Sequence, residues 1–149
     1  MKSLVTISYQ GVALQVPAWL AGVWRYDLPL NDFPSFCGAG KGLGDWLVPE
    51  KNHGAILSPA CFVHDIMWST SYDTYLHFQK ANNTFLKNLK SCVYSQLKDP
   101  KIAYLRCYGY WLAVSTIGII HFDPLVINPW SNRDVQEKLR RVRDAVISD

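Results

Sequence analysis

The chain reads Ser-Pro-Ala-Cys-Phe-Val-His-Asp-Ile-Met-Trp-Ser from residue 58 to residue 69, and this stretch predicts a helix. Serine at the cap position and proline in the first turn are typical of a helix N-terminus. Cys61 and His64 are three residues apart, so a helix places them on one face. Asp65 lies about 100° further round the axis, where it can reach a neighbouring loop while His64 faces a groove between helices.

Two helices are predicted to follow directly. Residues 69–74 are rich in hydroxyl groups and form the turn, and a second helix covers Phe78 to Leu97. Its apolar residues recur at helical spacing, at Phe85, Leu89, Val93 and Leu97. The first two helices therefore form an antiparallel pair that carries the His-Asp motif. Asp99-Pro100 ends the second helix, and a third runs from about Lys101 to Ile120. It is apolar on most sides, which predicts a buried core helix.

A last helix is predicted near the C-terminus, where Ser131-Asn132-Arg133-Asp134 resembles a capping box. Its apolar stripe consists of Val135, Leu139, Val142 and Val146, and the rest of that face is basic. Such charges usually mark a solvated face, and contact with an anionic membrane is the minority interpretation.

The N-terminal part of the chain predicts a small hairpin and a long loop. Residues 4–9 and 12–16 flank Gln10-Gly11 and indicate two short strands. Residues 18–58 contain three prolines besides six glycines, which is loop composition. The predicted fold is thus mainly α, with a small N-terminal β-hairpin, a long loop and further C-terminal helices.

Composition limits the class of protein. The chain has 149 residues, 49% of them hydrophobic and 18% charged, which predicts a single domain and excludes a disordered segment or a nucleic-acid tail. The start of the chain lacks the apolar run of a secretory signal. We therefore expect a cytoplasmic chain, one exported by another route, or one already processed. The apolar run at residues 109–120 is too short to span a bilayer.

The glycine-punctuated segment Phe36-Cys37-Gly38-Ala39-Gly40 supplies the second part of a candidate site. Calcium prefers oxygen ligands, many of them backbone carbonyls, and glycine allows the dihedral angles that turn carbonyls inward. Asp65 would add a carboxylate, and a neutral His64 can take a proton from water and return it. Together these features predict a hydrolytic calcium site.

Cys37-Gly38-Ala39-Gly40 and Cys61-Phe62-Val63-His64-Asp65 resemble the two motifs of the phospholipase A2 superfamily. The resemblance implies that His64 is the general base and that Asp65 is the calcium carboxylate. It also implies that Phe36, Gly38 and Gly40 donate carbonyl oxygens, and that Cys37 is bonded to Cys61. Trp46, Leu47 and Trp19 are candidates for a hydrophobic entrance.

The family supports its histidine with an aspartate from the antiparallel helix. With a turn near Asp73, the residues that face His64 are Asn82 and Asn83. An asparagine can fix the imidazole tautomer, but it stabilises imidazolium less than a carboxylate does. Asp73 or Asp45 would substitute if the fold brought either near. The position four after the histidine, often tyrosine in the family, is Trp68.

The other cysteines leave two alternatives open. Cys92 and Cys107 lie at similar distances from the turn at Asp99-Pro100, so they can face each other as a bridge or as buried thiols. A zinc site from Cys37, Cys61 and His64 is disfavoured, because no close Cys-x-x-Cys pair accompanies it and Asp65 would have no role.

The sequence as a whole predicts a calcium-dependent hydrolase of phospholipid acyl esters that acts at a membrane surface, without a nucleic-acid partner. The alternative is a catalytically inactive phospholipase-like module that binds lipid or protein, indicated by the asparagine pair. A purely structural helical domain within a larger assembly is the third interpretation.

Overall fold

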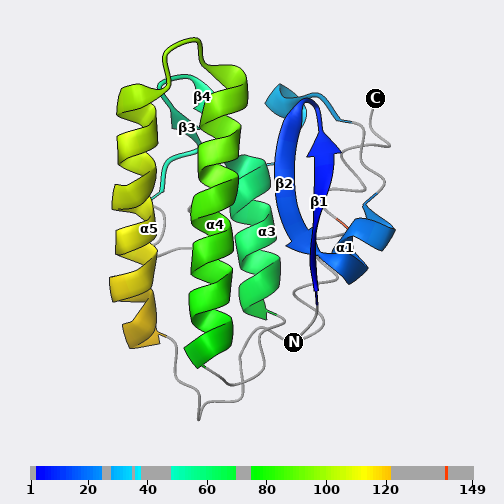
Figure 1. The fold of residues 1–149 in the computed structure, drawn as a ribbon, viewed down its shortest axis with the longest axis vertical. Coiled ribbons are helices and arrows are strands. Elements are labelled where there is room, and N and C mark those ends of the chain that lie inside the picture. The colour runs from blue at the N-terminus through cyan, green and yellow to red at the C-terminus, as the bar shows by residue number, and fades with distance from the viewer. Residues whose placement is uncertain are drawn as a thin grey trace.

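A computed structural model describes residues 3–24, 28–34, 36–37, 48–69, 75–121 and 140. This part of the chain is mainly helical, with an antiparallel hairpin at the N-terminal end, as the sequence predicts. Helices α3 (Ser58–Ser69), α4 (Tyr75–Gln96) and α5 (Lys101–His121) lie side by side, and neighbouring helices run in opposite directions (Figure 1). Helix α4 is central, since it contacts α3, α5 and the hairpin.

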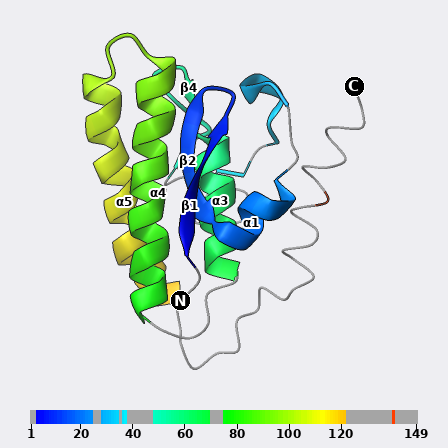
Figure 2. The same ribbon diagram turned by 45° about the vertical axis from the view of Figure 1, so that its right-hand side comes forward.

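The hairpin consists of β1 (Leu4–Tyr9) and β2 (Val12–Pro17), which pair from Leu4 with Pro17 to Tyr9 with Val12. Gln10 and Gly11 both have positive φ, at 48° and 80°. A two-residue turn of this kind matches the twist of the strands, and glycine adopts it without steric cost. Strand β2 buries its alternate residues against α4 and α3, over which the hairpin lies in Figure 2.

The segment predicted as one long loop contains regular structure, so that prediction is wrong in part. It includes a short helix α1 (Ala18–Val23), a 3-10 turn η1 (Leu30–Asp32) and a second hairpin. The second hairpin joins β3 (Lys51–Asn52) to β4 (Ala55–Ile56) through His53 and Gly54, which have positive φ of 52° and 94°. Two-residue strands carry too little hydrophobic alternation to be recognised from sequence.

The helix boundaries agree with the sequence to within three residues. Helix α3 covers the predicted residues, α4 starts at Tyr75 instead of Phe78, and α5 ends one residue after Ile120. Phe85, Leu89 and Val93 of the predicted stripe are fully buried. The predicted C-terminal helix lies outside the described residues, apart from Arg140, which is helical.

The core lies where the first hairpin, α3 and α4 meet. It is built from aliphatic side chains of β2 and from aromatic residues that contact one another, mostly at T-shaped or tilted angles. Phe62 of α3 packs against Phe36 at 4.8 Å and against Phe33 at 5.8 Å between ring centroids. Tyr9 of β1 joins the same cluster and donates a hydrogen bond to the carbonyl of Leu28 at 2.6 Å.

Helix α5 is not the buried core helix that its composition predicts. It lies at the edge of the molecule, where α4 is the helix that it packs against (Figure 1). One neighbouring helix covers one stripe, and on α5 only Ala103 and Cys107 are fully buried among the described side chains. Leu105 and Leu112, on the opposite side, remain exposed. No helix in the described ranges combines the length and the hydropathy that crossing a membrane requires.

Candidate active site

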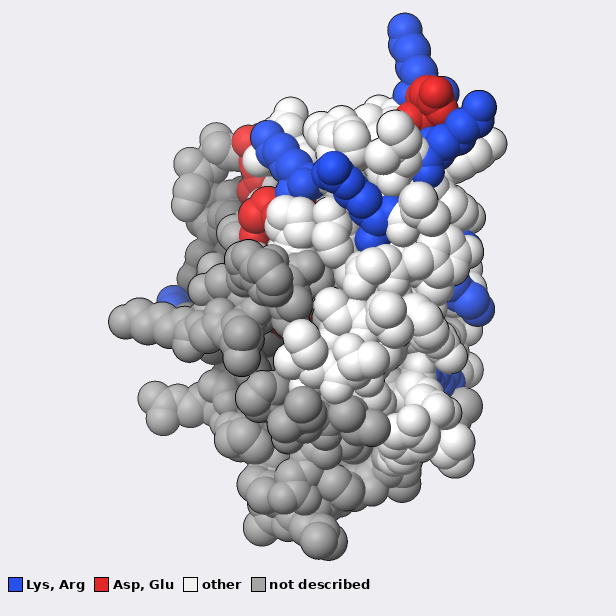
Figure 3. Space-filling model, turned by 90° about the vertical axis from the view of Figure 1, so that its left-hand side faces the viewer, with Lys and Arg blue, Asp and Glu red and all other residues white. Residues whose placement is uncertain are grey.

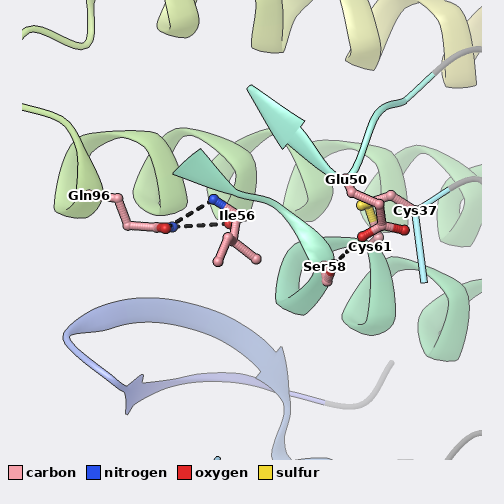
Figure 4. Close-up of a disulfide and its surroundings, with 6 residues drawn as sticks. All are labelled: Cys37, Glu50, Ile56, Ser58, Cys61 and Gln96. Carbon is pink, nitrogen blue, oxygen red and sulfur yellow. Dashed lines mark hydrogen bonds between the residues drawn. A yellow bond between two sulfur atoms is a disulfide. The ribbon is translucent and has the colours of Figure 1, made fainter. Parts of the chain in front are cut away.

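A disulfide between Cys37 and Cys61 ties the segment after η1 to the first turns of α3 (Figure 4). The Cα atoms of the two cysteines are 5.1 Å apart. Phe36 is buried next to the bridge and packs on Phe62. The bridge therefore fixes the approach of this segment to the helix that carries His64 and Asp65.

The beginning of α3 is held by side chains from two directions. Ser58 donates a hydrogen bond to the carboxylate of Glu50, and the Leu57 amide donates to the Glu50 carbonyl at 2.9 Å. On the other side, the Gln96 amide pairs with both backbone groups of Ile56, at 2.9 and 3.0 Å (Figure 4). Gln96 thus acts as a strand partner for β4, and this contact fixes α3 relative to α4.

Asn88 of α4 makes the same kind of contact with the N-terminal hairpin. Its side-chain oxygen accepts from the Gln15 amide at 2.7 Å, and its nitrogen donates to the Gln15 carbonyl at 2.9 Å. Buried backbone groups need such partners. Two amide side chains of α4 therefore connect both hairpins to the helix that faces His64.

His64 is buried between α3 and α4, with 7% of its surface exposed. Its ring stacks on Phe85, with 4.4 Å between centroids, and contacts the ring of Trp68 at 5.0 Å. Its Nε2 atom lies 2.8 Å from Oδ1 of Asn82, a side chain that is 1% exposed. The asparagine thus occupies the position from which the antiparallel helix can orient the imidazole.

Trp68 determines which way the Asn82 amide points. Its indole Nε1 lies 3.1 Å from the same Oδ1 atom. An indole N–H can only donate, so the atom that it meets must be the carbonyl oxygen of the amide. Nε2 of His64 therefore also donates to this oxygen, and a neutral imidazole then carries its lone pair on Nδ1. The Nδ2 group of Asn82 is buried and has no hydrogen-bond acceptor within the described part of the chain.

Only one of the two asparagines proposed from the sequence contacts His64. Asn82 contacts His64, whereas Asn83 is exposed on the next position of α4. Residues 82 and 83 are about 100° apart around the helix, so only one can face α3. Trp19 is half-buried on α1 and packs against the core. Gly38, Gly40, Asp45, Trp46, Leu47 and Asp73 lie outside the described residues.

The residues proposed for calcium are only partly described. Asp65 is partly exposed one turn after the bridged Cys61, and Phe36 directly precedes the bridged Cys37. Among the described residues, no group of three acidic, histidine or cysteine side chains could hold a metal ion. One carboxylate with backbone carbonyls is a donor set of the kind that calcium accepts, so the chemistry of these residues fits that ion.

Cys92 and Cys107 are free thiols buried at the α4–α5 interface, one of the two alternatives for this pair. Burial raises the pKa of Cys92 to about 12 and the pKa of Cys107 to about 11. Asn52 of β3 donates to the carbonyl of Ala103 at 2.7 Å beside Cys107. These thiols are kept protonated and belong to the packing of α5, not to the site at His64.

From the sequence Trp68 stands out only as a difference from the family's usual tyrosine, and its hydrogen bond to Asn82 was not predicted. Trp68 lies four residues after His64, a spacing that places both on one face of a helix, and this signal was available. No family model, no curated protein and no solved structure matches this chain. The interpretation of the site therefore depends on its motifs and on the geometry of these side chains.

Proposed function

We propose that this protein is a calcium-dependent hydrolase of phospholipid acyl esters, of the phospholipase A2 type. The observation that supports the proposal most strongly is the hydrogen bond from His64 to Asn82. It keeps a proton on Nε2 and leaves Nδ1 as the basic nitrogen. This is the state that a general base needs before it takes a proton from water.

In the proposed reaction, Nδ1 of His64 accepts a proton from a water molecule as the water attacks the ester carbonyl. The imidazolium then returns this proton to the leaving alkoxide, so that a fatty acid and a lysophospholipid are released. Asp65 and the carbonyls of Phe36, Gly38 and Gly40 would hold calcium, which supplies positive charge for the developing oxyanion. The Cys37–Cys61 bridge supports this assignment because it joins the segment to α3.

Asn82 favours a second candidate, an inactive module of the same fold that binds lipid or protein. A neutral amide orients the imidazole, but it lacks the charge that stabilises imidazolium. The hydrolase remains our first proposal, because Trp68 holds the amide in the one orientation that leaves Nδ1 basic.

Fatty-acid release from phospholipid vesicles tests the proposal. The full chain is assayed with millimolar calcium and with a chelator, beside His64→Gln and Asp65→Asn. We expect calcium-dependent release by the natural chain, none by His64→Gln, and a higher calcium requirement in Asp65→Asn. His53→Asn is the matched control, since His53 is exposed in a turn with positive φ that asparagine also adopts.

The outcomes separate the two candidates. If the natural chain releases no fatty acid with calcium, the hydrolase proposal is wrong. Binding to vesicles without release would then support the inactive module. Equal release by the natural chain and His64→Gln would show that the activity belongs to a contaminant or to another site.

A further inference from the structure

The exposed side of α4 and α5 carries several large apolar side chains. Leu105 is 72% exposed and Tyr94 is 75% exposed. The exposed large apolar residues of these two helices are Tyr75, Leu76, Tyr94, Ile102, Leu105, Tyr108 and Leu112. The last five lie on α5 and near the C-terminal end of α4, and we call their surface the α4–α5 face. Contiguous exposed apolar groups of this kind mark interaction sites more often than isolated ones do.

The charges around these side chains all have one sign along both helices. The segments that form α4 and α5 contain five lysine and arginine residues and no aspartate or glutamate. Lys87, Lys101 and Arg106 are exposed, and the turn between the helices exposes Lys98 together with Asp99. Figure 3 views the side on which α5 lies and shows a broad uncharged area, with lysine and arginine and also some acidic side chains around its upper part.

Lys90 of α4 contacts two tyrosines on the exposed side of α5. Its ammonium group donates to the Tyr108 hydroxyl at 3.2 Å and lies over the rings of Tyr104 and Tyr108, 4.8 and 5.1 Å from their centroids. These contacts raise the pKa of Lys90, chiefly through the Tyr108 hydroxyl, so the cation is retained. The face is therefore one continuous surface that combines tyrosines, aliphatic groups and positive charge.

We propose that the α4–α5 face docks onto an anionic lipid surface. Leucine and isoleucine would enter the headgroup region, tyrosine suits the boundary between lipid and water, and the basic residues would contact anionic headgroups. A second copy of the chain fits less well, because a symmetric pair through this face would bring lysine and arginine side chains of like sign together.

This inference does not depend on hydrolysis at His64. The imidazole lies where α4 packs on α3, whereas the α4–α5 face includes the outer side of α5, beyond α4 (Figure 1). Tyr94 also lies twelve residues after Asn82, which is about 18 Å along the helix axis. Docking and catalysis are therefore properties of different surfaces, and one can fail without the other.

Vesicle co-sedimentation of the full chain tests the docking surface. Vesicles of phosphatidylcholine are compared with vesicles of phosphatidylcholine and phosphatidylserine, in a chelator so that no calcium-dependent hydrolysis changes their composition. One variant combines Leu105→Ser with Leu112→Ser, and another combines Lys87→Gln, Lys101→Gln and Arg106→Gln. Val5→Ser is the control, because Val5 is an exposed apolar residue of β1.

We expect the natural chain and Val5→Ser to bind the anionic vesicles, and binding to weaken as salt is added. Each charge removed should weaken binding roughly fivefold, so the triple variant loses roughly a hundredfold. The two serines should weaken binding at least about tenfold. Circular dichroism of each variant checks that the helices are retained.

Three results would overturn the proposal. They are no binding to anionic vesicles by the natural chain, binding that the α4–α5 variants leave unchanged, and self-association in sedimentation that the two serines abolish. The last would identify the face as an interface between copies. Hydrolysis of a dispersed short-chain phospholipid, measured on the same variants, reports on His64 separately and should not change.

Discussion

Replacing Trp68 with phenylalanine removes one hydrogen-bond donor from the candidate site and keeps an aromatic ring there. In the natural chain the Asn82 carbonyl oxygen accepts from both Trp68 and His64, at 3.1 and 2.8 Å. A flipped amide would place its NH₂ group against the indole N–H. That arrangement loses the indole hydrogen bond and sets two donors against each other, with the indole N–H left unsatisfied, at a cost of about 2 to 3 kcal/mol.

A penalty of this size keeps the flipped amide below a few per cent of molecules, since about 1.4 kcal/mol corresponds to a factor of ten. In Trp68→Phe most of the penalty disappears, and the amide can present its nitrogen to His64 instead. Nε2 would then accept, and the imidazole proton would move to Nδ1. We expect a large fraction of neutral His64 to change tautomer, with a loss of about 1 kcal/mol or more in the free energy of unfolding.

Nitrogen-15 NMR of histidine-labelled protein distinguishes the two tautomers directly, and urea denaturation measures the stability. Trp111→Phe is the matched control, because the Trp111 indole N–H is buried without a hydrogen-bond partner among the described residues. It should leave His64 unchanged. The reasoning is refuted if neutral His64 in the natural chain carries its proton on Nδ1, or if Trp68→Phe leaves the tautomer as it was.

Three other outcomes can be measured. Asn82→Asp should raise the rate of the proposed hydrolysis about tenfold, because a charge-assisted hydrogen bond replaces a neutral one. In the Asn82→Asp variant, Trp68→Phe should no longer change the tautomer of His64. Reducing the bridge between Cys37 and Cys61, which are 24 residues apart, should lower the free energy of unfolding by about 3 to 4 kcal/mol in urea denaturation. Burial raises the pKa values of Cys92 and Cys107 from 9.0 to about 12 and about 11. The thiols of the unfolded chain therefore lose their protons at lower pH than those of the folded chain. The free energy of unfolding should then fall above pH 9 by up to about 1.4 kcal/mol per pH unit for each thiol. Alanine variants at the two thiols should show a correspondingly smaller fall between pH 9 and 11.

The long helices were predictable because each shows a clear signal. Ser58-Pro59 marks the start of α3, and the stripe Phe85, Leu89 and Val93 marks the buried side of α4. The first hairpin was predictable from Gln10-Gly11 between two alternating segments. Helix α1 was not predicted because its six residues make less than two helical turns. Strands β3 and β4 were not predicted because two residues each are too few to show an alternation of apolar and polar side chains.

The exposure of α5 could not be predicted from its composition. An apolar sequence predicts burial only if enough other elements surround the helix, and this depends on tertiary arrangement. Among the described helices, α4 is the one with extensive contacts to α5, and Leu105 and Leu112 on the far side of α5 remain exposed. Tertiary arrangement also decides whether Asn82 or Asn83 faces His64, because this depends on how α4 is rotated about its axis. Two adjacent identical residues do not indicate that rotation.

Residues 68 and 82, at which the chain differs from the phospholipase A2 pattern that its motifs resemble, are best understood together. A carboxylate at position 82 would accept a proton from Nε2 with either oxygen, so it would need no neighbour to orient it. An amide has one accepting end and one donating end, and its effect on His64 depends on which end faces the ring. Trp68 can only donate, so its contact with Oδ1 removes this ambiguity. Tyrosine could not do the same, because its hydroxyl both donates and accepts. Asn82 with Trp68 therefore reproduces the orienting effect of a carboxylate without its charge, and a site built in this way is expected to select the correct tautomer while stabilising the imidazolium less.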